Sequence, residues 1–269
     1  MRFLKVTLCT MTAAMFGVLC VSESPAGKKT TAWKEILPDD VYKELTKRSI
    51  AFIETTAKTG DKDLADRIEV EAAILAAFTM SVKDPAADGP SMMRGAALQA
   101  SKAARAGDLD KLKNFGATVG KAPKAPAQIK DFTVYLQATE PMMKTFLGKG
   151  KKGDGIHPDL QYQVKLKNLN GIEALVSTLA GKKLTDENVA KLSKELPFVA
   201  YRLAAAGSIT HEFTPKKDVD KWRDLSATMR DQAVALAEAA SKKNGANILK
   251  AATALDNTCI ECHSAFKNK

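Results

Sequence analysis

The sequence predicts an all-α protein with two helical units, of which the second is a four-helix bundle. Hydrophobic residues make up 45% of the 269 residues and aromatic residues only 6%, and alanine is abundant, which favours helices. After residue 35, apolar residues recur at steps of three and four, and glycine, proline and acidic N-cap signals separate the runs. We therefore expect antiparallel helices joined by short connections.

Residues 1–26 have the pattern of a secretory signal peptide. A basic start, MRFLK, precedes an apolar run and a small-residue exit that ends at Ala26. An uncleaved anchor is the weaker alternative, because the run is shorter than the ~20 residues of a membrane span. Lipid attachment at Cys20 is weaker still, because Leu19 rather than a small residue precedes it. We expect an exported, periplasmic chain with no transmembrane domain after cleavage.

Residues 27–147 are expected to form an N-terminal helical domain. Apolar periodicity predicts helices near residues 41–53, 64–78, 91–106 and 108–119. Weaker signals predict further helices at residues 127–136 and after Pro141. The segment GKGKKGDGIHP, residues 148–158, is rich in glycine and lysine and is the best candidate for a linker between the two domains.

Residues 159–269 should form the four-helix bundle. Its helices are expected at residues 159–180, 185–206 and 218–243, and from residue 246 almost to the C-terminus. Thr185, followed by two acidic residues, is a good N-cap. Pro197 should bend the second helix and Gly207 should end it. His211 would then lie in the loop that follows.

The last helix carries the string CIECH, with Cys259, Cys262 and His263. Because Cys9 and Cys20 lie in the signal peptide, these two cysteines are the only ones left after cleavage. Their spacing, with a histidine directly after the second, is typical of one covalently attached haem c. Steps of three and four from Leu249 to Phe266 place both cysteines on the apolar face of the helix.

Three alternative readings of this string are weaker. A thioredoxin-type redox pair would begin a helix in a βαβ setting rather than close an alanine-rich helical chain. A zinc site would need four ligands, and the string supplies three. A chance string would leave a haem-free structural bundle.

With this motif near the end of a fourth helix, and Phe266 and Lys267 shortly after it, residues 159–269 resemble class II c-type cytochromes, the cytochrome c′ group. The resemblance implies thioether bonds at Cys259 and Cys262 and axial iron ligation by His263. It implies a haem pocket that includes Phe266, with Leu166 or Leu169 of the first helix facing the other side of the iron. Because no methionine occurs between Met143 and Met229, a five-coordinate iron is favoured.

Three further residues compete for the second side of the iron. Met229 has the spacing of a core residue, so ligation by its sulfur is the less favoured interpretation. His211 is expected to be solvated in its loop. His157 lies in the linker, where an exposed imidazole is the default.

These features predict an exported mono-haem cytochrome that transfers single electrons and is not an enzyme, because no nucleophile–base set stands out. The alternatives are a five-coordinate haem domain that binds a small gas such as NO or CO, and a helical partner-binding module with the haem domain as its relay. The net charge of +10 favours an acidic redox partner protein, and no motif indicates nucleic-acid binding. Cytochromes c′ are often dimers, which makes a homodimer a candidate assembly.

The N-terminal domain is expected to be a haem-less repeat of the C-terminal one. Met93-Arg94, an alanine-rich helix and a glycine break parallel Met229-Arg230 and the segment that follows it. Where the haem motif would fall in the first copy, residues 122–126 read Ala-Pro-Lys-Ala-Pro, without a thiol or a histidine.

Overall fold

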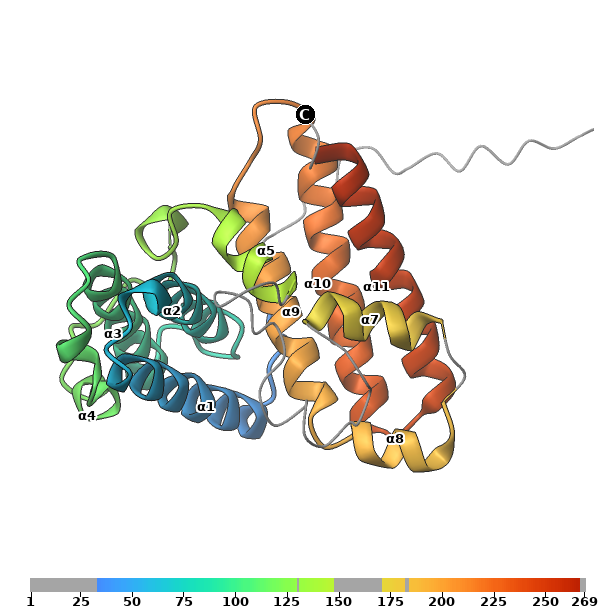
Figure 1. Ribbon diagram of the computed structural model, residues 1–269, viewed down its shortest axis with the longest axis horizontal. Helices are drawn as coiled ribbons and strands as arrows, with labels where there is room; N and C mark the ends of the chain where they lie inside the picture. Colours follow the sequence, from blue (N-terminus) through green and yellow to red (C-terminus); the bar gives the residue numbers. More distant parts are fainter. Residues whose placement is uncertain (1–32, 130, 148–170, 182–183, 267–269) are drawn as a thin grey trace, which may run out of the picture.

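The computed structural model describes residues 33–129, 131–147, 171–181 and 184–266, and within these ranges all regular secondary structure is helical (Figure 1). The all-α prediction is therefore confirmed. The signal peptide, residues 1–26, and the linker, residues 148–158, lie outside the described residues. No helix in the described ranges combines the length and hydropathy needed to cross a membrane.

The first half of the chain is organised around α2. Its helices are α1 (Asp39–Lys58), α2 (Ala65–Met80), α3 (Asp88–Arg105), α4 (Phe115–Val119) and α5 (Thr139–Leu147), with 3₁₀ turns η1 (Lys62–Leu64), η2 (Leu109–Leu112) and η3 (Phe132–Val134). Helix α2 packs against α1, α3 and α5 and also against α9 of the second half. Helix α2 is buried on almost every side, which explains why its own apolar residues are spread around its circumference and do not form a single stripe.

Two expected helices of the first half were wrong. Residues 108–119 form η2 and the five-residue helix α4 rather than one helix. The Glu54 carboxylate of α1 accepts a 2.8 Å hydrogen bond from the Gly116 amide, so this amide at the start of α4 bonds a side chain instead of a helical carbonyl. The described part of residues 127–136, which leaves out residue 130, contains only η3, where the Asp131 side chain caps the turn by accepting a hydrogen bond from the Thr133 amide.

The second half contains α7 (Ile172–Ala180), α8 (Asp186–Leu192), α9 (Leu196–Glu212), α10 (Val219–Ser241) and α11 (Gly245–Phe266). Helix α10 packs between α9 and α11, and α11 also packs against α7. The expected N-cap is confirmed, because the Thr185 hydroxyl accepts a hydrogen bond from the Asn188 amide at 3.3 Å. The α10 and α11 boundaries lie close to the expected ones.

The expected single helix at residues 185–206 was wrong, because the region forms α8 and α9. Neither Pro197 nor Gly207 has the role predicted for it. Pro197 lies in the first turn of α9, where its missing N–H costs no hydrogen bond, so it starts a helix instead of bending one. Gly207 lies inside α9. A Cβ atom there would stand 2.7 Å from the Arg230 nitrogen and 2.9 Å from the Ser226 carbonyl oxygen of α10. This glycine therefore permits a close helix crossing.

The longer α9 places His211 in its last turn, where the residue is 8% exposed, so the expectation of a solvated loop histidine was wrong. The expected helix at residues 159–180 also does not run unbroken. Gly171 has a φ of 105°, outside the helical region, and α7 begins directly after it.

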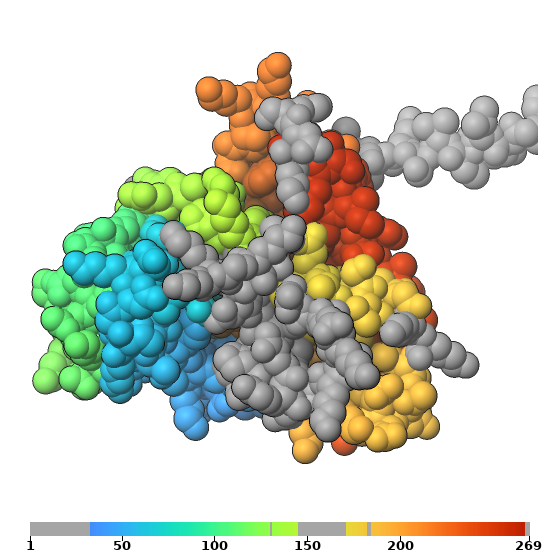
Figure 2. Space-filling view, in the orientation of Figure 1, coloured from blue at the N-terminus to red at the C-terminus, as the bar shows by residue number. Residues whose placement is uncertain are grey.

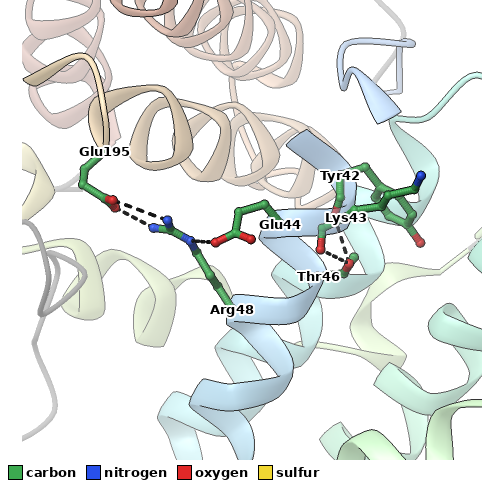
Figure 3. A network of polar contacts seen from close by, with 6 residues as sticks. All are labelled: Tyr42, Lys43, Glu44, Thr46, Arg48 and Glu195. Atoms are coloured by element: carbon green, nitrogen blue, oxygen red, sulfur yellow. Dashed lines mark hydrogen bonds and ion pairs between the residues drawn. The ribbon is translucent and has the colours of Figure 1, made fainter. Parts of the chain in front are cut away.

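The two halves share one continuous hydrophobic core. The Arg202 guanidinium of α9 donates two hydrogen bonds to the Glu71 carboxylate of α2, whose side chain is 2% exposed. Arg48 of α1 bridges Glu44 on its own helix and Glu195 at the start of α9 (Figure 3). Figure 2 shows the first half (blue to yellow-green) on one side of the molecule and the second half (yellow to red) on the other.

Helices α3 and α10 have two features in common. Arg94 and Arg230, at matching places in the two helices, are 0% and 1% exposed. At the same distance along the chain from each arginine, Gly107 and Lys243 have positive φ angles of 67° and 53°. The amide after each of these residues bonds a carbonyl of the last helical turn, at 2.9 Å for Asp108 and 3.0 Å for Asn244.

Candidate functional site

The motif residues of α11 line an apolar pocket in the second half of the protein. Cys259, Cys262 and His263 form one wall. The other walls come from α5, α7, α9 and α10 and include Met143, Glu173, Val176, Leu203, Thr210, Trp222, Leu225, Ser226 and Met229. Both thiols and the imidazole therefore line one cavity.

The register of α11 explains this placement. Its fully buried residues follow steps of three and four and comprise Ile248, Ala251, Ala252, Leu255 and Thr258. Cys259, Cys262 and His263 lie beside this stripe and are half-buried, at the edge where the helix meets the pocket. Side chains at this edge contact apolar walls on one side and remain accessible on the other.

Trp222 holds the end of the pocket together. Its indole N–H donates a 2.6 Å hydrogen bond to the Thr210 carbonyl near the end of α9. Its ring meets the Phe266 ring edge to face, with centroids 5.0 Å apart. The end of α9, the start of α10 and the end of α11 therefore meet at the upper end of these helices in Figure 1. Phe266 supports a pocket residue instead of lining the pocket itself.

The environment of the two thiols disfavours the thiolate. Burial, followed by the negative charges of Glu173 and Asp256, raises the pKa of Cys259 to about 12. Burial, followed by the charge of Glu261, also raises the pKa of Cys262. Reactive Cys-x-x-Cys pairs of redox enzymes have lowered pKa values instead. Both thiols are free, and neither is prepared for disulfide exchange at neutral pH.

Glu173, in the first turn of α7, faces the imidazole of His263. The distance between its Oε1 atom and the Nδ1 atom of His263 is 3.5 Å, and each side chain is 33% exposed. The carboxylate therefore lies next to Nδ1, which is the ring nitrogen that remains free when Nε2 binds a metal.

The other predicted site residues have different outcomes. Leu166, Leu169 and His157 lie outside the described residues. Met229 lines the pocket, whereas His211 does not. The sequence reading missed Met143 and Glu173, which belong to helices remote from the motif and follow no pattern that refers to it.

Among the described residues, no three side chains of His, Cys, Asp or Glu are grouped so that they could hold a metal ion by themselves. Comparison of the chain with protein-family models, curated proteins and solved structures gave no match. The functional argument therefore rests on the pocket residues. A haem needs only one axial ligand and two thiols from this wall of the pocket, and the residues present fit that requirement.

Proposed function

We propose that this protein is an exported mono-haem c-type cytochrome that transfers single electrons. The observation that carries the proposal is the position of Cys259, Cys262 and His263 on one wall of an apolar pocket. The two thiols lie about one helical turn apart, as attachment to both vinyl groups of one haem requires.

In this proposal Cys259 and Cys262 hold the haem through thioether bonds, and His263 binds the iron. The bound haem would supply a one-electron couple between ferric and ferrous iron. The apolar walls contributed by Val176, Leu203 and Leu225 would exclude water and favour the form with less net charge.

Two methionines of the pocket are candidates for the second axial position. Helices α10 and α11 are antiparallel, and Trp222 lies beside Phe266. Met229, about two turns further along α10, therefore lies near the level of Cys259, where a thioether bond to the edge of the haem would form. Met143 belongs to α5, which packs on α7 and α9. We favour Met143, and with it a six-coordinate iron in place of the five-coordinate iron expected from the sequence, because Met143 reaches the pocket from α5 rather than from α10 or α11.

The fold of this part fits a four-helix bundle of cytochrome c′ type. The arrangement of four helices supports this proposal, since α9 packs against α10, α10 against α11 and α11 against α7. The shared features of α3 and α10 support a degenerate repeat in the first half. In the first half, the segment at residues 122–126 lies on the surface of α3, because the Ala125 carbonyl accepts hydrogen bonds from Ser91 and Arg94.

The cellular setting also belongs to this proposal. Residues 1–26 would direct the chain to the periplasm, and the charge of +10 suits an acidic redox partner protein. A homodimer remains a candidate assembly.

The proposal is tested by producing the full chain in a host that attaches haem c and measuring its mass after denaturation. We expect the mass of one haem to stay with the chain, and to be lost in the double variant C259S/C262S. The native protein should then be reduced and reoxidised reversibly by a one-electron mediator. A chain without covalent haem would refute the proposal. A high-spin spectrum that changes with carbon monoxide would replace electron transfer by gas binding.

A further inference from the structure

Glu173 has a fixed position relative to the motif helix. The Thr253 hydroxyl, which donates to the Leu249 carbonyl of its own helix at 2.8 Å, also lies 3.4 Å from the Ala180 carbonyl, so the end of α7 contacts α11. At the other end, the turn at Gly171 starts α7 directly before Glu173. Glu173 and His263 therefore belong to two helices that pack against each other and that have a second contact between Ala180 and Thr253.

The chemistry of an iron-bound histidine gives this contact a role. When one imidazole nitrogen binds a metal, the other N–H commonly donates a hydrogen bond to a carboxylate, which fixes the ring and makes the ligand more basic. At 3.5 Å the Nδ1–Oε1 distance is longer than the ~2.7–3.2 Å of N–H···O hydrogen bonds. The Glu173 side chain, one third of which is exposed, would have to rotate towards the imidazole to form one.

We infer that Glu173 positions His263: its carboxylate accepts a hydrogen bond from the Nδ1–H group of the imidazole. Glu173 thereby lowers the reduction potential of the haem. This inference rests on the proposed function. A more basic imidazole and a nearby negative charge both stabilise ferric iron over ferrous iron, so both lower the potential. Among the described residues, His263 is the only ion-pair partner of Glu173.

A merely structural role for Glu173 is the competing explanation. An acidic residue in the first turn of a helix interacts favourably with the helix dipole, whatever lies opposite. A control must therefore remove a similar charge without touching the imidazole. Asp256 serves this purpose, because both carboxylates act on Cys259 through their charge. Asp256 lies on α11 about two helical turns before His263.

The experiment compares wild type, E173Q, E173A and D256N as full-length proteins. Covalent haem is first measured by mass after denaturation, and absence of haem from the wild type overturns the proposed function together with this inference. The midpoint potential is then measured by redox titration, and exchange of the His263 Nδ1 proton with solvent by NMR.

We expect E173A to shift the ferric–ferrous equilibrium about tenfold towards ferrous iron, which corresponds to about 59 mV for one electron. E173Q, whose neutral amide still accepts a hydrogen bond, should shift it less than E173A but more than D256N. Proton exchange should accelerate in E173A and stay unchanged in D256N. Equal potentials for E173A and D256N with normal covalent haem, or unchanged proton exchange in E173A, would overturn the inference and leave the proposed function intact.

Discussion

Replacement of Gly207 by alanine tests the close crossing of α9 and α10. The added Cβ atom would stand 2.7 Å from the Arg230 nitrogen, 2.9 Å from the Ser226 oxygen and 3.0 Å from the Arg230 Cα atom. All three are backbone atoms, so no side-chain rotation can relieve the contact and the helices must move apart. Overpacking costs ~1–3 kcal/mol, and three backbone contacts of 3.0 Å or less place this substitution in the upper part of that range, at ~2–3 kcal/mol. The higher helix propensity of alanine offsets ~1 kcal/mol.

We therefore expect G207A to lower the free energy of unfolding by about 1–2 kcal/mol. Urea unfolding followed by circular dichroism measures this change. The control is G89A in α3, where an added Cβ atom meets nothing within 4 Å. This variant should be unchanged or more stable by up to ~1 kcal/mol. Equal stability of G207A and wild type would show that the helices do not cross as closely as described.

Three further variants test other parts of the structure. R202M removes the guanidinium that donates two hydrogen bonds to the buried Glu71 carboxylate and should cost ~3 kcal/mol of unfolding free energy, whereas the double variant R202M/E71M should recover most of it. M143L should convert a low-spin haem spectrum to one that responds to carbon monoxide, and M229L should not; the reverse result would reassign the ligand. Burial raises the pKa of Asp231, but hydrogen bonds from its neighbours outweigh this and lower it overall. Its stabilising effect is therefore present above ~pH 3.9 and lost as the pH falls further, so the difference in melting temperature between wild type and D231N should vanish in acid.

Local signals predicted the helices that carry the motif. The steps of three and four along α10 and α11, and the hydroxyl of Thr185 before an acidic turn, depend on neighbouring residues alone. The same periodicity predicted Cys259 and Cys262 on the buried stripe itself, whereas the fully buried stripe ends at Thr258 and both cysteines lie beside it. The helices and the N-cap could be predicted because sequence spacing and helix geometry determine them directly.

Signals that depend on distant parts of the chain failed. Gly207 reads as a helix stop in isolation, but the backbone of α10 is what requires a glycine there. The same error led to the wrong prediction that His211 lies in a solvated loop, because the longer α9 includes and buries it. Met143 and Glu173 reach the pocket from α5 and α7, and no spacing in the sequence relates those helices to the motif.

The core shared by the two halves also determines how the molecule can open. Helix α2 contacts α9 directly, and the Glu71–Arg202 pair between them is largely inaccessible to water. A fluctuation that exposes α2 must therefore disrupt α9 and, with it, a wall of the pocket that contains Cys259 and Cys262. Native-state hydrogen exchange should place the amides of α2 and α9 in one cooperative unit with the same opening free energy.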